Sequence, residues 1–93
     1  MKSILLKEYG SILTGREFGK QVAKELMMNS SAPVMLDFQG VVSLGSSFGD
    51  EVVPPLALRQ EKNISIINAN HSIKTILRDV AADASINIKF QDG

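Results

Sequence analysis

The chain has 93 residues, with ten basic and ten acidic side chains, one histidine and no cysteine. A chain of this length fits one domain in which nearly every apolar residue serves a single core, so we expect residues 1–93 to form one domain. Without cysteine there is no disulfide, thiolate nucleophile or zinc ribbon, and one histidine cannot complete the usual metal-ligand or triad sets. The composition therefore argues against most hydrolases and metalloenzymes, and we expect neither a metal nor a cofactor.

The even charge balance also argues against nucleic-acid binding, because such domains usually carry a basic face that neutralises several phosphates. Near the start, the apolar run at residues 4–6 is followed by Lys7 and Glu8. This run is far shorter than the core of a signal peptide or a membrane span. We therefore expect a cytoplasmic protein that binds neither nucleic acid nor a membrane.

The first third of the chain predicts a strand and a helix. The apolar run within residues 3–9 indicates a strand that ends in a turn at Gly10. The segment 14–17, Thr-Gly-Arg-Glu, has the spacing of a capping box, in which the Thr14 side chain would accept a hydrogen bond from a first-turn amide. The apolar positions that follow keep one helix face dry and are 18, 22, 23, 26 and 27. A helix is therefore predicted to start there and to end at residues 29–33.

The middle of the chain predicts a buried strand and a second helix. The apolar run 34–38 is typical of a strand that is buried on both faces of a sheet. Ser47 is the predicted N-cap of the helix that follows, with Asp50 in its first turn. Because Pro54 and Pro55 lack amide donors, we expect a turn or kink at these residues.

The last third predicts a strand, a helix and an edge strand. The segment 63–68 is rich in β-branched residues, as in a buried strand. Asn70 is the predicted N-cap of a helix whose apolar positions are 73, 76, 77, 80, 81 and 84. Residues 86–90 alternate apolar and polar side chains, which indicates a strand near the sheet edge with one wet face. Residues 91–93 are expected to fray.

This alternation of strands and helices predicts the α/β class. We expect a single small domain with a four-stranded sheet, mostly parallel or mixed, and about three crossover helices. Open sheets of this class bind ligands at the carboxyl ends of their strands, where the chain places Asp37, the loop 43–51 and residues 68–71.

Few residues at this edge carry recognisable chemistry. Ser46 and Ser47 could cap a helix, or could carry or bind a phosphate, since a helix start favours an anion. Asp37 lacks the second titrating group or metal that acid–base catalysis needs, which favours a structural role accepting loop amides. His71 is expected to lie at the surface. Phe48 must enter the core or act as an exposed anchor, and the core is favoured. These residues do not indicate an enzyme.

The stretch 34–51 resembles the STAS-like domain family, which is related to the anti-sigma factor antagonists. The family motif is a strand ending in Leu-Asp-Phe, a Gly-Val turn and a Ser-rich loop that leads to Phe-x-Asp-Glu at a helix start. The matching residues are Leu36-Asp37-Phe38, Gly40-Val41, Ser46-Ser47 and Phe48-Gly49-Asp50-Glu51. The family often has an Arg at the start of its first helix, and Arg16 fits that place.

The resemblance implies a STAS-like fold and a non-enzymatic role in regulation through protein–protein interaction. In the anti-sigma factor antagonists a Ser within Asp-Ser-Ser-Gly is phosphorylated by a partner that is both kinase and anti-sigma factor. The resemblance implies Ser47 for that position, with Ser46 as its neighbour. Gly45 replaces the Asp of that loop and Phe48 replaces its Gly. The implied partner is an ATPase or kinase of the histidine-kinase type.

The leading hypothesis is a docking surface on the 43–51 loop and the helix that follows, switched by serine phosphorylation. The candidate partner-binding or phosphoacceptor residues are Ser46, Ser47, Phe48, Asp50 and Glu51, supported by Asp37, Gly45 and Arg16. The negative charges of Asp50 and Glu51 would oppose a phosphate nearby. The alternative is a module that binds a small anion or nucleotide through the amides of residues 45–49. A homodimer through the exposed edge 86–90 is a further option.

Overall fold

The computed structural model describes residues 1–91 as an α/β domain in which every strand pair is parallel. The main sheet has the order β1-β3-β5-β6, with β1 (Lys2–Leu5), β3 (Val34–Asp37), β5 (Asn63–Ile67) and β6 (Asn87–Gln91). A smaller sheet pairs β2 (Ile12–Leu13) with β4 (Ser43–Leu44). The helices are α1 (Arg16–Asn29), α2 (Ser46–Leu58) and α3 (His71–Ala84), and a 3₁₀ helix, η1 (Leu6–Tyr9), follows β1. The predicted fold class is confirmed.

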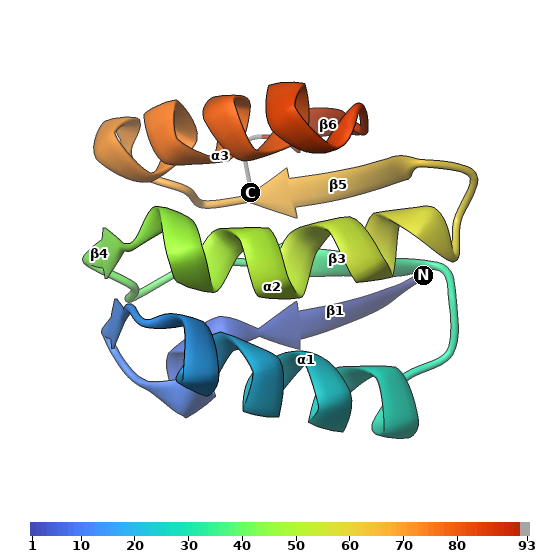
Figure 1. Ribbon diagram of the computed structural model, residues 1–93, viewed down its shortest axis with the longest axis horizontal. Coiled ribbons are helices and arrows are strands. Elements are labelled where there is room, and N and C mark those ends of the chain that lie inside the picture. Colours follow the sequence, from blue (N-terminus) through green and yellow to red (C-terminus); the bar gives the residue numbers. More distant parts are fainter. Residues whose placement is uncertain (92–93) are drawn as a thin grey trace.

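All three helices cover the same face of the main sheet (Figure 1). Along the chain, each new strand of the main sheet is added next to the previous one, always on the same side. Right-handed crossovers that all run in one direction across a sheet place their helices on the same face. On β3 the side chains of Val34 and Leu36 face the helices and are fully buried, whereas Met35 and Asp37 are half-buried. The prediction that 34–38 is buried on both faces is therefore wrong. Helices cover both faces of a parallel sheet only where the direction of the crossovers reverses, and here it does not.

The helix α3 follows its predicted pattern. Ile73, Leu77 and Val80 are buried, and the other predicted apolar positions are partly buried against the core. Asn70 is the N-cap, and its side chain accepts a hydrogen bond of 2.8 Å from the Ile73 amide. Both the cap and the buried face are confirmed.

The helix α1 starts near the predicted residue but without the predicted capping box. Its N-cap is Gly15, which has a φ of 95° and offers no side chain to the first turn. Few residues other than glycine adopt this backbone conformation. Thr14 lies outside the helix and against Gly45, so it cannot satisfy the first-turn amides of α1.

The helix α2 runs unbroken through Pro54 and Pro55, so the expected turn at these residues is wrong. Each proline removes one amide donor and costs about 3 kcal/mol in a helix interior. Against this, burying a Val or Leu side chain contributes about 1.5–3 kcal/mol each, and the flanking residues Val52, Val53, Leu56 and Ala57 are all buried. Packing therefore outweighs the lost hydrogen bonds. The N-cap of α2 is Gly45 rather than the predicted Ser47, which is the second helical residue.

The strand β6 lies at the predicted edge of the main sheet, paired only with β5. Gln91 belongs to this strand, so the expectation of fraying is wrong for it, and residues 92–93 lie outside the described residues. Over residues 1–91, no helix has the length and apolar content needed to cross a membrane.

Candidate functional site

The starts of α1 and α2 lie side by side because the small sheet holds the two chain segments that precede them (Figure 1). Leu13 of β2 and Leu44 of β4 are aligned partners, and both side chains are buried. The Gly45 amide then donates a 2.8 Å hydrogen bond to the carbonyl of Leu13. Since both strands lead directly into helices, α1 and α2 start parallel at one end of the molecule. We call the exposed and half-buried residues of the segments 14–17 and 45–51 the helix-start surface.

The two helices lie close together at Gly19, beside this surface. A Cβ atom built on Gly19 would lie 3.0 Å from the Glu51 Cβ and 3.1 Å from the Phe48 Cα and carbonyl oxygen. Gly19 is absent from the predicted site residues, although a glycine inside a helical pattern is itself a sequence signal of close packing. Gly19 therefore sets the spacing at which Glu51 meets α1.

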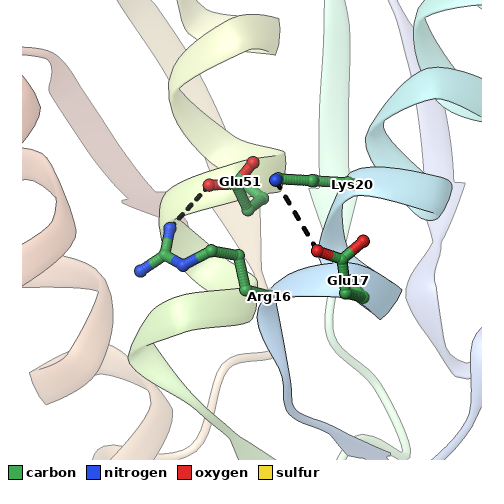
Figure 2. Close-up of polar contacts among 4 residues, drawn as sticks. All are labelled: Arg16, Glu17, Lys20 and Glu51. Carbon is green, nitrogen blue, oxygen red and sulfur yellow. Dashed lines mark hydrogen bonds and ion pairs between the residues drawn. The ribbon is translucent and has the colours of Figure 1, made fainter.

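An ion pair joins the two helix starts (Figure 2). The Arg16 Nη1 donates to the Glu51 Oε2 at 2.7 Å, with 52% of the Arg16 side chain and 24% of the Glu51 side chain exposed. A second ion pair lies beside it on α1, where the Lys20 Nζ is 3.7 Å from the Glu17 Oε1. Pairs this exposed contribute at most about 1 kcal/mol to stability. The pair therefore fixes the arrangement of charges on this surface more than it stabilises the fold.

The two candidate serines are the first two residues of α2. Ser46 is exposed and Ser47 is half-buried. Gly45 at the N-cap has no side chain with which to accept from the first-turn amides. The start of α2 therefore presents backbone donors and the positive end of the helix dipole next to two hydroxyl groups.

Phe48 lies in the core rather than on the helix-start surface. Its side chain is 1% exposed, and its ring packs 5.4 Å from that of Phe18, measured between centroids, at an interplanar angle of 50°. Phe48 is therefore removed from the set of candidate docking residues, and it acts as a positioning residue where α1 and α2 meet. Asp50 and Glu51 are half-buried and stay in the set.

Asp37 lies at the end of β3 and organises a neighbouring loop. Its Oδ1 accepts a 2.9 Å hydrogen bond from the Gln39 amide and a 3.0 Å hydrogen bond from the Asn68 side chain. The described hydrogen bonds do not include one between Asp37 and His71, which is exposed at the start of α3. Asp37 thus supports the loop between β3 and β4 and takes no direct part in the helix-start surface.

Other features of the described chain do not add chemistry to this surface. Two shallow hollows have volumes of about 360 and 180 Å³. The first lies around Pro33, Asn63 and Asn87, and the second lies between β1 and the end of α1, so neither contains a residue of the helix-start surface. Within residues 1–91 no group of three or more His, Cys, Asp or Glu is placed to hold a metal ion. What the surface offers is charge, hydroxyl groups and helix-start amides.

The comparisons with known proteins identify a family. No curated protein and no solved structure matches the chain. Residues 14–74, which span α1, β3, α2, β5 and the start of α3, match the family described as STAS-like domain of unknown function (DUF4325). The resemblance seen in the sequence is confirmed, and the chain belongs to this STAS-like family.

Proposed function

We propose that the chain is a non-enzymatic regulatory module that docks on a protein partner through the helix-start surface, and that phosphorylation of Ser46 or Ser47 switches the docking. The observation that carries the proposal is the Arg16–Glu51 pair at 2.7 Å, because it links two parallel helix starts beside two serines. The resemblance to anti-sigma factor antagonists supports an ATPase of the histidine-kinase type as the partner.

The geometry of α2 suggests how a phosphate would act. Ser47 and Glu51 are four residues apart, so they share one face of the helix with their Cβ atoms about 5–6 Å apart. A phosphate on Ser47 would add a charge of about −1.5 to −2 at a helix start that favours anions. It would repel Glu51 and attract Arg16, so the guanidinium would exchange one partner for the other. The switch is thus a local exchange, in which Arg16 leaves Glu51 and pairs with the phosphate on Ser47.

The first experiment tests the modification without assuming a partner. The chain is incubated with extract of its native cells and ATP, and its intact mass and peptides are then measured. One added phosphate on Ser46 or Ser47 supports the proposal, and it should disappear in the variant with both serines changed to Ala. Ser72 is the matched control, because it is exposed and is the second residue of α3 as Ser47 is of α2. Phosphate on Ser72 alone would contradict the proposal.

The second experiment measures docking to the ATPase recovered from those cells. Ser47→Asp and Ser47→Ala should change the affinity in opposite directions, with the Asp variant differing from wild type by about fivefold, as for an exposed charge pair. Arg16→Gln should abolish the effect of Ser47→Asp, since the proposed responder is then absent. If Ser47→Asp acts equally with and without Arg16, the proposed exchange is wrong.

A second candidate, binding of a small anion or nucleotide, is favoured by the uncapped start of α2. Inorganic phosphate and a nucleotide panel are the probes, and thermal unfolding is the readout. A ligand present at a hundred times its dissociation constant would add about 2.7 kcal/mol of stability. An absence of any shift across the panel would exclude this candidate and leave docking.

A further inference from the structure

We infer that the free edge of β6 binds an extended acidic peptide segment of a partner protein, which adds a fifth strand to the main sheet. This inference does not depend on the helix-start surface, since β6 and β1 lie at opposite ends of the strand order and α1 and α2 cover the other strands. Three observations carry it: an open strand edge, an uncompensated pair of cations above it, and the repulsion that two copies of this edge would experience.

The outer side of β6 offers unpaired backbone groups. β6 pairs only with β5, and the Asn87 amide donates to the Lys62 carbonyl at 2.7 Å. In a parallel ladder the residues that bond one neighbour alternate with residues whose amide and carbonyl groups point the other way. Ile88 and Phe90 therefore direct their backbone groups away from the sheet, which is the template that an added strand uses.

Two cations stand over this edge, and neither has a carboxylate partner among residues 1–91. The Lys74 Nζ lies 5.8 Å and the Arg78 Cζ 5.4 Å from the centroid of the Phe90 ring. The acidic residues of α3, Asp79 and Asp83, lie about 100–180° around the helix from these cations, at about 100° per residue.

The cations extend to both faces of the edge. Lys89 is exposed and, because side chains alternate along a strand, it points to the face opposite Phe90. A strand added beside β6 would therefore meet Lys74 and Arg78 on one face and Lys89 on the other. Carboxylates at successive positions of that strand would each reach a cation.

The same charges argue against a second copy of this chain as the occupant. Pairing β6 with β6 of another copy would bring two sets of Lys74, Arg78 and Lys89 to one junction, and like charges facing one another across strands destabilise the pairing. An acidic strand removes this conflict. We therefore commit to an acidic segment of a different protein.

The test uses short valine-rich peptides that carry pairs of adjacent glutamates or adjacent lysines, so that charged side chains point to both faces of the added strand. It measures binding and amide hydrogen exchange. The acidic peptide should bind and the basic one should not. On binding, exchange of the Ile88 and Phe90 amides should slow by more than about tenfold, whereas the Lys89 amide, which faces β5, should be protected already in the free protein. Fast exchange at Ile88 and Phe90 in the presence of bound peptide would overturn the inference.

Variants separate this edge from general charge attraction. The double variant Lys74→Gln, Arg78→Gln should bind the acidic peptide more weakly, with the affinity falling by about threefold per removed cation, as for exposed charge pairs. The matched control is Lys20→Gln with Lys24→Gln, which removes two exposed cations at the same spacing from α1. Equal weakening by both pairs would overturn the inference. So would light scattering that shows a dimer in which the Ile88 and Phe90 amides are already protected, because the occupant would then be a second copy.

Discussion

At the scale of single residues, Gly19 controls how closely α1 and α2 approach. Changing Gly19→Ala should gain about 0.5–1 kcal/mol of helix propensity, yet its new Cβ would lie 3.0–3.1 Å from Glu51 Cβ and from Phe48 backbone atoms. Because backbone atoms cannot yield as a flexible side chain can, and overpacking costs about 1–3 kcal/mol, we expect a net loss near 1 kcal/mol. Thermal unfolding measures this loss as a fall of about 4–8 °C in Tm.

Gly49 is the matched control for this prediction. It is also a helical glycine, but a Cβ there would meet the Val80 Cγ2 methyl at 3.2 Å rather than backbone. Gly49→Ala should therefore lose less stability than Gly19→Ala. A Gly19→Ala variant as stable as wild type would contradict the prediction, because the cost of moving the helices apart would then be no larger than the gain in helix propensity of about 0.5–1 kcal/mol.

At the scale of elements, Asn70 joins the start of α3 to the loop before β4. Its Oδ1 caps the helix at the Ile73 amide, and its Nδ2 donates to the Val42 carbonyl at 3.1 Å. Asn70→Ala removes both bonds and should lower the free energy of unfolding by about 1–2 kcal/mol. Asn70→Asp keeps the cap and loses only the donor, so it should be the milder change. Denaturant titration of both variants checks the order, and equal losses would mean that the cap contributes nothing.

The sequence predicts those elements whose hydrophobic period is long enough to be recognised. The pattern of α3 extends over several turns, and the structure confirms it. The β-branched run is confirmed as the strand β5, although only its alternate residues Ile64 and Ile66 are buried. The strands β2 and β4 have two residues each, which is too short for any period, so both are absent from the prediction. The strand predicted over residues 3–9 ends at Leu5, and η1 takes the place of its second half. The continuity of α2 could not be predicted either, because the packing that outweighs its prolines comes from other elements.

The candidate site shows the same division between local and tertiary information. The Ser-rich loop can be recognised in the sequence because it belongs to the contiguous motif 34–51, and Arg16 because the family often has an Arg at the start of its first helix. The burial of Phe48 is the option that the sequence favours, but its packing against Phe18 depends on how α1 and α2 meet. That Arg16 meets Glu51 depends on the pairing of β2 with β4. Such relations join residues that are distant in sequence, and a single sequence contains no local signal for them.

At the scale of the whole molecule, the one-sided arrangement of helices makes the two faces of the main sheet unequal. Ile66 and Ile67 test this, since they are adjacent on β5, are chemically identical and point to opposite faces. Ile66 is fully buried beneath the helices, whereas Ile67 is half-buried. Ile66→Ala should therefore cost about 2–5 kcal/mol of unfolding free energy, the usual range for a core site, and Ile67→Ala about 1 kcal/mol. Equal losses in chemical denaturation would mean that something packs on the face of the sheet opposite the helices in solution. A concentration dependence of the Ile67→Ala loss would then identify a second copy of the chain as the covering element, because only association makes stability depend on protomer concentration.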